Sequence, residues 1–357
     1  MNNPNILVIG NGFDLYHDLK TNYIDFVEFA KELTISTQGT KGRYLAISNS
    51  FVNCFIKVAS ENQSWIDCEK EIEIIVTMIL KILYDRNVFA TNSPYIVKDK
   101  SSLYSYEFER LKLMDKFCSK SMLKALMFRE KAFMLWGKVL MLRGQAIMFR
   151  NRYFRTYEGI DKNMILETLK CDLNDLIQLF KYYLEEKVIN QSVTKLSNQI
   201  ENIKPDYVIN FNYTNTYEHY GINRQDVCYI HGSVEDDNMV LGIRDIDEKD
   251  INSIHFKKFF QRIQKHTDII QWDKFGVNNS LSGTERNANT YFFGHSLSNN
   301  DGDLIKNIYE NSRKIIIFHM ESQKDYEQKI INLIDTLGKE SVIQGMYSGK
   351  IEFVPIK

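Results

Sequence analysis

The sequence predicts an α/β fold, with a mostly parallel sheet and a large helical insertion. The first observation is the stretch Asn5–Asp14, in which an apolar run leads directly into Gly-Asn-Gly at positions 10–12. Such a run is typical of a buried parallel strand that ends in a tight turn before a helix. The second observation is that strand signals return after Pro205 and alternate with helical patterns to the C-terminus.

Between these two parts, the pattern from about residue 45 to residue 204 is almost wholly helical and carries no parallel-strand signal. We therefore expect a discontinuous α/β domain of residues 1–40 and 205–357, and a helical insertion domain of residues 41–204. The expected later strands are 207–211, 227–230, 240–241, 290–293, 315–318 and 351–354. The segment 13–33 has helical character, with Thr21 or Asn22 as the candidate N-cap. The other expected helices are 163–188, 214–220, 254–268, 302–309 and 323–337.

The composition is that of an ordinary globular protein, with 44% apolar and 25% charged residues among 357. A formal net charge of −1 gives no overall field toward nucleic acid or membrane, so such a role needs a local patch. The five cysteines are scattered and form no CxxC pair, which favours reduced thiols over disulfides or a zinc site. No apolar stretch reaches the roughly 18 residues of a spanning helix, and we expect a cytoplasmic protein.

A heptad repeat places methionines at 127, 134, 141 and 148. The surrounding segment, residues 116–155, holds ten Lys or Arg residues and one acid, Glu130. A helical stripe of this kind suits a membrane surface, an oligomer seam or a nucleic-acid groove. A core helix with Lys and Arg stems along its sides is the plainer interpretation, and short strands joined at glycines are an alternative. We predict no membrane anchor here, whereas nucleic acid and a homo-oligomer remain open as partners.

An acidic cluster follows Trp65. Asp67 and Glu71 are four residues apart and share a helix face, as do Glu69 and Glu73. Such carboxylates can hold Mg²⁺ or act as general acid and base. The plainer interpretation is an exposed helix start, where the helix dipole favours acidic side chains.

Polar side chains also follow three later strands. Asn212 follows strand 207–211, His231 follows strand 227–230, and Gly294-His295-Ser296 follows strand 290–293, with Asp301 soon after. Because parallel strands bring their carboxyl ends to one edge of a sheet, we expect Asp14, Asn212, His231 and His295 to converge there. The Asn212 side chain can hydrogen-bond a ribose hydroxyl or a water molecule, and the His231 ring can accept a proton near neutral pH. His295 alternatively serves only as a turn or cap residue.

Four segments carry a family resemblance in this order. They are Ile-Gly-Asn-Gly-Phe-Asp at 9–14, Asn-Phe-Asn-Tyr-Thr at 210–214, Ile-His-Gly at 230–232 and Phe-Gly-His-Ser-Leu at 293–297. Together they resemble the AbiH family of bacterial abortive-infection proteins, which the Trp65-x-Asp67-x-Glu69 element also fits. The chain departs from the family at 17–20, with His-Asp-Leu-Lys in place of His-Gly-Leu-Pro. The resemblance implies phage defence, in which an infected cell stops growing.

The order of a Gly-rich first turn, an Asn-bearing strand end and a His-Gly strand end is similar to that of sirtuin-like domains. This more distant resemblance implies a Rossmann-like sheet that binds NAD and an NAD glycohydrolase-like reaction without a metal ion. It implies catalytic roles for Asn212 and His231 and a nucleotide-binding turn at Gly10 to Asp14, although Phe13-Asp14 stands where those relatives have a small residue and Ser. Because Asp14 and His295 lie at the same expected edge, we also expect them to be catalytic. The expected nucleotide contacts are Gly10, Asn11, Gly12, Phe13, His17, Gly232, Gly294, Ser296 and Asp301.

Two alternatives remain at this point. A metal-dependent nuclease or nucleotide hydrolase would use Asp67, Glu69, Asp14 and Asp301 with histidines as ligands, and the basic 116–155 segment for nucleic acid. A non-enzymatic nucleotide sensor would instead control oligomerisation through the heptad segment. EDTA-insensitive loss of NAD separates the first hypothesis from both alternatives.

Overall fold

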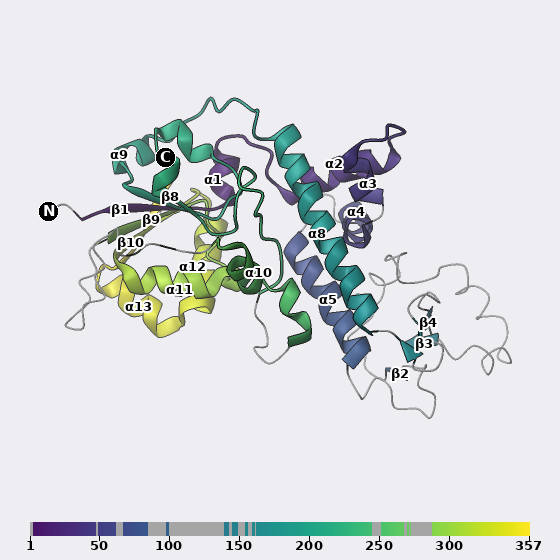
Figure 1. The fold of residues 1–357 in the computed structure, drawn as a ribbon. Coiled ribbons are helices and arrows are strands. Elements are labelled where there is room, and N and C mark those ends of the chain that lie inside the picture. The colour runs from purple at the N-terminus through teal and green to yellow at the C-terminus, as the bar shows by residue number, and fades with distance from the viewer. Residues whose placement is uncertain are drawn as a thin grey trace. The chain divides into compact units, whose positions relative to one another are not determined.

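The computed structural model describes residues 3–47, 49–61, 67–84, 162–244, 251–267, 270, 272 and 288–357, together with short strands at 98–99, 139–142, 145–148, 154–155 and 159–160. The chain divides into two compact units (Figure 1). The first contains Met1–Asn22, Tyr183–Val240 and Lys258–Lys357, and the second contains Tyr23–Tyr182 and Leu241–Lys257. The domain boundaries that we expect from the sequence, 1–40 with 205–357 and 41–204, stay a prediction.

The first unit is built on a six-stranded, all-parallel sheet in the order β11-β10-β9-β1-β7-β8. This confirms the predicted parallel α/β architecture. Its strands are β1 (Asn5–Ile9), β7 (Tyr207–Asn210), β8 (Val227–Tyr229), β9 (Ala288–Phe293), β10 (Ser312–His319) and β11 (Ile351–Pro355).

Central strand β1 pairs with β7 on one side and with β9 on the other. Strands β7 and β8 follow β1 on one side of it in the sheet. Strands β9, β10 and β11 come later in the chain and lie on the other side of β1. This is the strand order of doubly wound dinucleotide-binding sheets, in which ligands bind at the carboxyl ends where the order reverses. In this sheet the reversal lies between β1 and β9.

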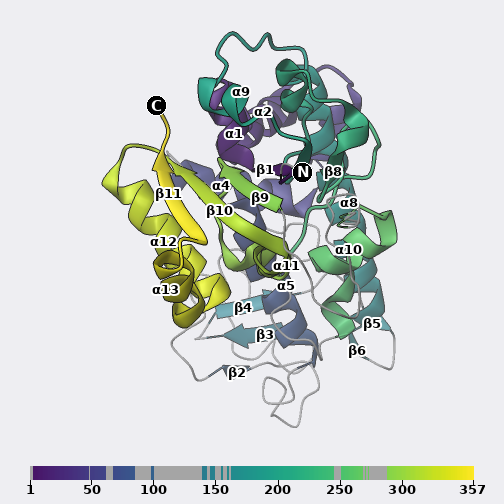
Figure 2. The ribbon, with the colours of Figure 1, turned by 90° about the vertical axis from the view of Figure 1, so that its left-hand side faces the viewer.

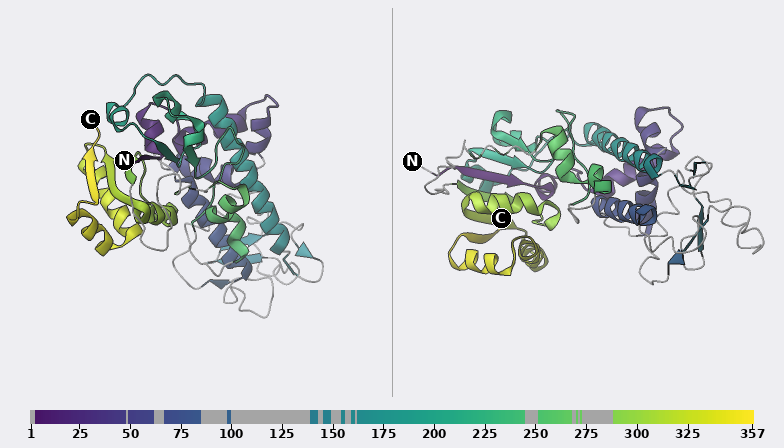
Figure 3. Two further views of the ribbon diagram at one scale, coloured as in Figure 1. Left: turned by 60° about the vertical axis from the view of Figure 1, so that its left-hand side comes forward. Right: turned by 60° about the horizontal axis from the view of Figure 1, so that its bottom comes forward.

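Both faces of the sheet are covered (Figures 2 and 3). Along β1, Ile6 and Val8 pack with one hydrophobic cluster and Leu7 and Ile9 with another, as the two-residue period of a strand requires. The first cluster includes side chains from α11 (Gly302–Asn311), α12 (Gln323–Leu337) and α13 (Lys339–Tyr347). The second includes side chains from α1 (Asn11–Tyr16), α9 (Asn198–Ile203) and the 3₁₀ helix η4 (Thr216–Tyr220).

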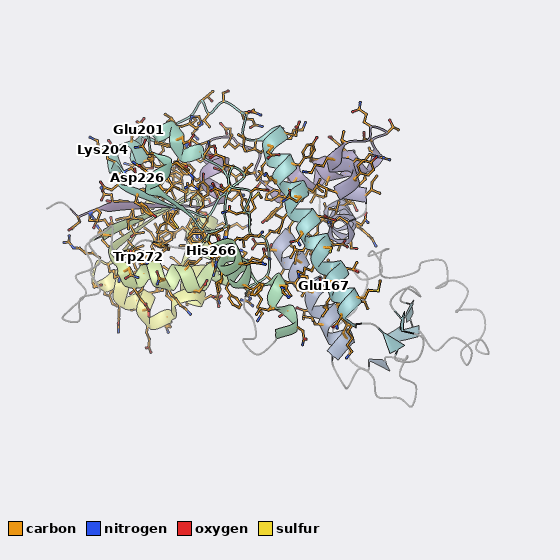
Figure 4. The ribbon with its side chains drawn as sticks, viewed as in Figure 1. Glu167, Glu201, Lys204, Asp226, His266 and Trp272 are labelled. Carbon is orange, nitrogen blue, oxygen red and sulfur yellow. The ribbon has the colours of Figure 1, made fainter. Side chains whose placement is uncertain are left out.

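Among its described residues this unit also contains the helices η5 (Arg224–Asp226), α10 (Lys258–Lys265) and η8 (Asn299–Asp301). Helix α9 ends at Ile203, and Lys204 follows in a left-handed conformation with φ +49° (Figure 4). That conformation turns the chain through Pro205 toward β7. The expected strand at 240–241 is wrong, because Val240 lies in a loop and donates its N–H to the carbonyl of His231 at 2.7 Å.

The second unit is mainly helical. It contains α2 (Tyr23–Ile35), α3 (Lys41–Ile47), α4 (Ser50–Glu61), α5 (Cys68–Tyr84), η6 (Ile251–Phe256) and most of α8 (Lys162–Lys187). The carboxylate of Asp172 on α8 accepts the N–H of Ser50 at 3.3 Å, and its carbonyl accepts the Asn49 side chain at 2.6 Å. Helix α8 therefore fixes the start of α4.

Two helical expectations are corrected. The helical character expected over 13–33 is divided into α1 and α2, because Asp18 adopts φ +62° and Leu19 donates back to the Asp14 carbonyl at 3.1 Å. Helix α2 begins at Tyr23, directly after the expected N-cap candidates Thr21 and Asn22. The expected helix 254–268 is η6 followed by α10.

The unit also contains short strands where the sequence suggested helix: β2 (Lys98–Asp99), β3 (Val139–Leu142), β4 (Gln145–Met148), β5 (Phe154–Arg155) and β6 (Gly159–Ile160). Strands β3 and β4 pair antiparallel, with Leu142 opposite Gln145. The preferred core-helix interpretation of the heptad repeat is therefore wrong for 139–142 and 145–148, and the alternative of short strands holds for these residues. Gly144 between the strands disfavours helix. The rest of the 116–155 segment, apart from β5, lies outside the described residues.

Within the described ranges, no helix combines the length and the apolar character needed to cross a membrane. We expect the heptad segment not to act as a membrane anchor either, because its charges and two glycines interrupt any continuous apolar face. Cell fractionation checks this, with the full chain expected outside the membrane pellet. Recovery in that pellet, with release by detergent but not by salt, contradicts the prediction.

Candidate functional site

The turns after β1 and β9 pack directly on each other at the point where the strand order reverses. Gly10 donates its N–H to the Phe293 carbonyl at 3.2 Å, and Gly12 donates to the Gly294 carbonyl at 2.8 Å. Phe13 donates to the Gly10 carbonyl at 2.8 Å. The glycines thus allow one backbone to approach another. Nucleotide contact by Gly10, Gly12 and Phe13 stays a prediction, and all three N–H groups have protein partners in this structure.

Asp14 lies on α1 directly behind the first turn and is only 1% exposed. Its Oδ2 accepts a hydrogen bond from the Thr214 hydroxyl at 2.6 Å, while its buried Oδ1 has no partner among the described residues. Burial raises the pKa of Asp14 to about 6, against the opposing effect of hydrogen bonds from Thr214, Thr216 and Asn212. Asp14 is therefore a largely ionised carboxylate at neutral pH, with one oxygen unsatisfied.

Asn212 follows β7 and reaches across to the first turn. Its side-chain Nδ2 donates to the Gly10 carbonyl at 3.0 Å, and its backbone N–H donates to Asn210 Oδ1 at 2.8 Å. Asn210 in turn donates its Nδ2 to the Thr214 carbonyl at 2.9 Å. This network holds Asn212 beside Gly10 and beside Asp14.

His231 follows β8 and pairs with Asp301. The His231 Nε2 lies 3.1 Å from Asp301 Oδ1, and the Lys258 Nζ lies 3.4 Å from the same oxygen. Burial would raise the pKa of Asp301, but Lys258 and His231 outweigh it and hold that pKa well below its usual range. An ionised Asp301 accepts the Nε2–H of His231, which leaves a lone pair on Nδ1. That buried Nδ1 has no hydrogen-bond partner in the described part of the chain.

His295 lies in the turn after β9. Its Nδ1 accepts the N–H of Leu297 at 3.0 Å, which is a contact within its own turn. The ring packs edge-on against Phe211 with centroids 4.4 Å apart, and Phe211 also meets the ring of His231 at 5.6 Å. Burial lowers the pKa of His295 to about 4, so this histidine is neutral at physiological pH. Leu297 adopts φ +60°, which for a leucine is a strained conformation.

His17 is held by the fold through both ring nitrogens. Nδ1 lies 2.6 Å from the Phe13 carbonyl, and Nε2 lies 2.8 Å from the Tyr220 hydroxyl, which accepts the N–H of Ser197. This pattern fits a neutral ring that donates Nδ1–H to the Phe13 carbonyl and accepts the Tyr220 hydroxyl at Nε2, and burial lowers the pKa of His17.

The remaining predicted contacts lie at the start of α1 and in the turns after β8 and β9. Asn11 and Ser296 are exposed, and Ser296 donates its hydroxyl to Ser298 Oγ at 3.3 Å. Gly232 has φ +71° and packs against Asn238 so closely that a Cβ would lie 2.3 Å from the Asn238 carbonyl oxygen.

The structure thus brings the predicted catalytic residues into two adjoining groups at the carboxyl edge. Asp14 and Asn212 form the first group, and His231, His295 and Asp301 form the second. Gly10 lies between the two groups. Its carbonyl accepts the Asn212 side chain, and a Cβ on it would lie 2.8 Å from the Cα of His295. Lys258 and Thr214 were missed as site residues. Nothing in the local sequence distinguishes Lys258 from other helix residues, whereas Thr214 ends the Asn-Phe-Asn-Tyr-Thr motif, which could have pointed to it.

The model of the family described as "Bacteriophage abortive infection AbiH" matches residues 6–319. The chain belongs to the AbiH family. Its role is therefore in bacteriophage abortive infection. Comparisons with curated proteins and with solved structures find no match. The AbiH match includes all four polar strand ends and stops at the last residue of β10.

The acidic cluster of this AbiH chain lies in the second unit. Asp67 Oδ1 accepts the N–H of Lys70 at 3.0 Å and so caps the start of α5. Glu69 accepts a long hydrogen bond of 3.5 Å from the Tyr23 hydroxyl. Trp65 lies outside the described residues. Across the described ranges, no three His, Cys, Asp or Glu side chains form a group able to hold a metal ion.

The buried carboxylate of Asp14 gives the AbiH fold a predicted pH dependence. The folded pKa of about 6 lies above the unfolded value of 3.8, so the folded state holds the proton more tightly. The stability from this group is complete below pH 3.8 and is lost as pH rises through 6, by roughly 3 kcal/mol. Asp14→Asn removes that loss. We expect its free energy of unfolding, relative to wild type, to increase steadily between pH 4 and pH 7 in urea titrations.

The matched control is Asp18→Asn, an exposed position on the same turn whose φ of +62° asparagine tolerates. His295 titrates in the same window with the opposite sign, because its pKa is lowered. Both proteins contain His295, so its contribution cancels when the free energy of unfolding of wild type is subtracted from that of Asp14→Asn. Parallel curves for Asp14→Asn and Asp18→Asn contradict the assignment.

Proposed function

We propose that this AbiH protein stops infected cells by cleaving the N-glycosidic bond of NAD or a related nucleotide. The observation that supports this most is the His231–Asp301 pair, with Nε2 and Oδ1 3.1 Å apart and Nδ1 left without a partner among the described residues. The pair stands at the carboxyl edge of a sheet with the strand order of dinucleotide-binding folds. A histidine oriented by a carboxylate is the arrangement that general-base catalysis requires.

In the proposed reaction, the bond between ribose C1′ and the nicotinamide nitrogen breaks, and its electron pair returns to the ring, so nicotinamide leaves as a neutral molecule. Water attacks the oxocarbenium-like sugar at C1′. His231 Nδ1 takes the proton of that water, and Asp301 stabilises the imidazolium that forms. Lys258 keeps Asp301 ionised for this role. No metal ion takes part in this scheme.

Asp14 and Asn212 would act on the sugar. With its pKa near 6, Asp14 carries a negative charge at neutral pH and would stabilise positive charge that develops on the ribose. Asn212 would position the ribose and the attacking water. His295 is neutral at this pH. Its ring packs against Phe211, and the Phe211 ring also packs against His231. The part of His295 is therefore to position the base.

The deciding experiment incubates the purified full chain with NAD, and separately with RNA and DNA, each with and without EDTA. Release of nicotinamide and ADP-ribose that EDTA does not affect supports the proposal. EDTA-sensitive cleavage of nucleic acid supports instead the metal-dependent alternative, with the basic 116–155 segment as the contact surface. Binding of NAD without turnover supports the sensor alternative. Cellular NAD during infection gives the matching measurement in vivo, and we expect it to fall before lysis.

A further inference from the structure

Helix α12 directs a row of polar side chains at the turn after β9. Lys329, Asn332 and Thr336, which we call the polar row, stand at positions i, i+3 and i+7 and therefore share one face of the helix. Lys329 and Thr336 are buried, where an amphipathic helix ordinarily has apolar side chains. Burial of a polar group is costly unless it is hydrogen-bonded, so the partners of the polar row indicate what it does.

The partners are successive backbone carbonyl groups of the turn. The hydrogen bonds, of 3.1, 2.8 and 3.1 Å, run from Lys329 Nζ to the His295 carbonyl, from Asn332 Nδ2 to that of Ser296 and from Thr336 Oγ1 to that of Leu297. The carbonyl before them, that of Gly294, accepts the N–H of Gly12. Four carbonyl groups in sequence are thus held by hydrogen bonds, three of them from α12.

The polar row ends on a strained residue of the turn. Leu297 has φ +60°, a left-handed conformation that is unfavourable for a leucine and persists only where neighbouring groups hold it. In this conformation its N–H donates to Nδ1 of His295 at 3.0 Å. Because the His295 ring is neutral at physiological pH, a ring whose Nδ1 accepts a hydrogen bond carries its proton on Nε2. The conformation of Leu297 therefore sets the tautomer of His295.

We infer that the polar row positions the candidate site: by holding these carbonyl groups it keeps Leu297 in its left-handed conformation, and so fixes the tautomer and orientation of the His295 ring. This deepens the proposed function and rests on it for the reaction, though not for the positioning. Helix α12 begins after residue 319, where the AbiH match ends, so a segment outside the family model holds a motif within it. Apolar side chains would dock a helix on the sheet at less cost, and departures from such local rules are typical of functional sites.

The test compares Thr336→Val with Thr336→Ser. Valine keeps the shape of threonine and loses the hydroxyl, whereas serine keeps the hydroxyl and loses the methyl group. We expect Thr336→Val to lower phage protection about 10- to 100-fold in plaque counts, because a misplaced catalytic group costs that much, and Thr336→Ser to stay within about threefold of wild type. A role in packing alone predicts the opposite order, since valine fills the position and serine leaves a cavity.

The tautomer is read directly by ¹⁵N NMR of the histidine rings at neutral pH. The His295 signals are those absent from the spectrum of His295→Gln. Wild type and Thr336→Ser should carry the ring proton on Nε2 alone, whereas Thr336→Val should show both tautomers in exchange. Melting curves of the same proteins show whether each variant is folded.

Asn332→Asp is the second variant and keeps the test decisive if Thr336→Val does not fold. Aspartate has the same shape, and one oxygen can still accept Gln328 Nε2, which lies 2.8 Å from Asn332 Oδ1, but the other cannot donate to Ser296. Asn332 is only partly buried, so we expect a folded protein with lowered protection and mixed tautomers. The matched control is Asp335→Asn, the reverse change at an exposed position of α12, which should behave as wild type.

Unchanged protection and tautomer in folded Thr336→Val or Asn332→Asp overturn the inference, as does a Thr336→Ser variant that loses as much protection as Thr336→Val. NAD cleavage is measured on the same preparations. If wild type does not cleave NAD but the tautomer and protection follow the presence of the hydroxyl, the proposed reaction is wrong and the positioning stands. If all variants cleave NAD at the wild-type rate, the reaction stands and the positioning is wrong.

Discussion

Replacing Gly294 with alanine should prevent the α/β unit from folding. Gly294 has φ +68°, and a Cβ at this position would lie 2.0 Å from the Phe13 nitrogen and 2.3 Å from the Gly12 carbonyl carbon. Both are backbone atoms of the first turn, so no side-chain rotation relieves the clash. Relief requires parting the β1 and β9 turns and breaking the 2.8 Å bond from Gly12 to Gly294. We expect a cost above about 4 kcal/mol, measured as loss of soluble protein or of a cooperative melting transition.

Gly349→Ala is the matched control. Gly349 has nearly the same φ, +72°, but a Cβ there meets nothing within 4 Å. Its substitution carries only the conformational penalty of about 1–2 kcal/mol, and the variant should stay soluble and cooperative. If Gly294→Ala has the same free energy of unfolding as Gly349→Ala, the turns after β1 and β9 do not pack as closely as described.

His231→Gln should leave the fold intact and abolish function. The Gln amide nitrogen can take the place of Nε2 as donor to Asp301, so the buried carboxylate keeps a partner. The lone pair of Nδ1 is lost, and with it the proposed base. We expect NAD cleavage to fall about 10²–10⁴-fold, with loss of protection in plaque counts and a melting temperature within a few degrees of wild type. Asn212→Ala should likewise stay folded and lose protection.

His219→Gln is the control for this prediction, because His219 is an exposed histidine of η4 in the same unit. It should keep both activity and protection. If His231→Gln and Asn212→Ala still protect, or lose protection only because they unfold, the assignment of the carboxyl edge fails. The cluster around Asp67 and Glu69 then becomes the better candidate.

The apolar runs locate all six strands of the main sheet, because a buried parallel strand needs several consecutive apolar residues wherever it lies in the chain. They also predict that Asp14, Asn212, His231 and His295 stand at strand ends on one edge. The pairing of His231 with Asp301 was not predicted. It depends on which strands are neighbours and on how the segment after β9 folds, and both are set by tertiary packing.

The division of the first expected helix and the missed site residue Lys258 each have a local physical cause. The first expected helix breaks at Asp18, whose left-handed conformation is compatible with an aspartate and leaves little trace in hydrophobic periodicity. Lys258 looks like an ordinary charge on an amphipathic helix, yet it is buried and contacts Asp301. Periodicity reports which side of a helix is apolar, and α10 instead buries cationic side chains such as Lys258 and Arg262.

The position of β1 at the centre of the sheet affects how the chain can be made. Its partners begin at Tyr207 and Ala288, so the first strand synthesised stays unpaired while the ribosome adds the whole intervening sequence. At about 5–20 residues per second, that delay is on the order of ten seconds or more. Such long-range pairing folds slowly and exposes an apolar strand meanwhile. It also means that the four residues that the proposed function needs together, Asp14, Asn212, His231 and Asp301, are not all present until the ribosome has added residue 301.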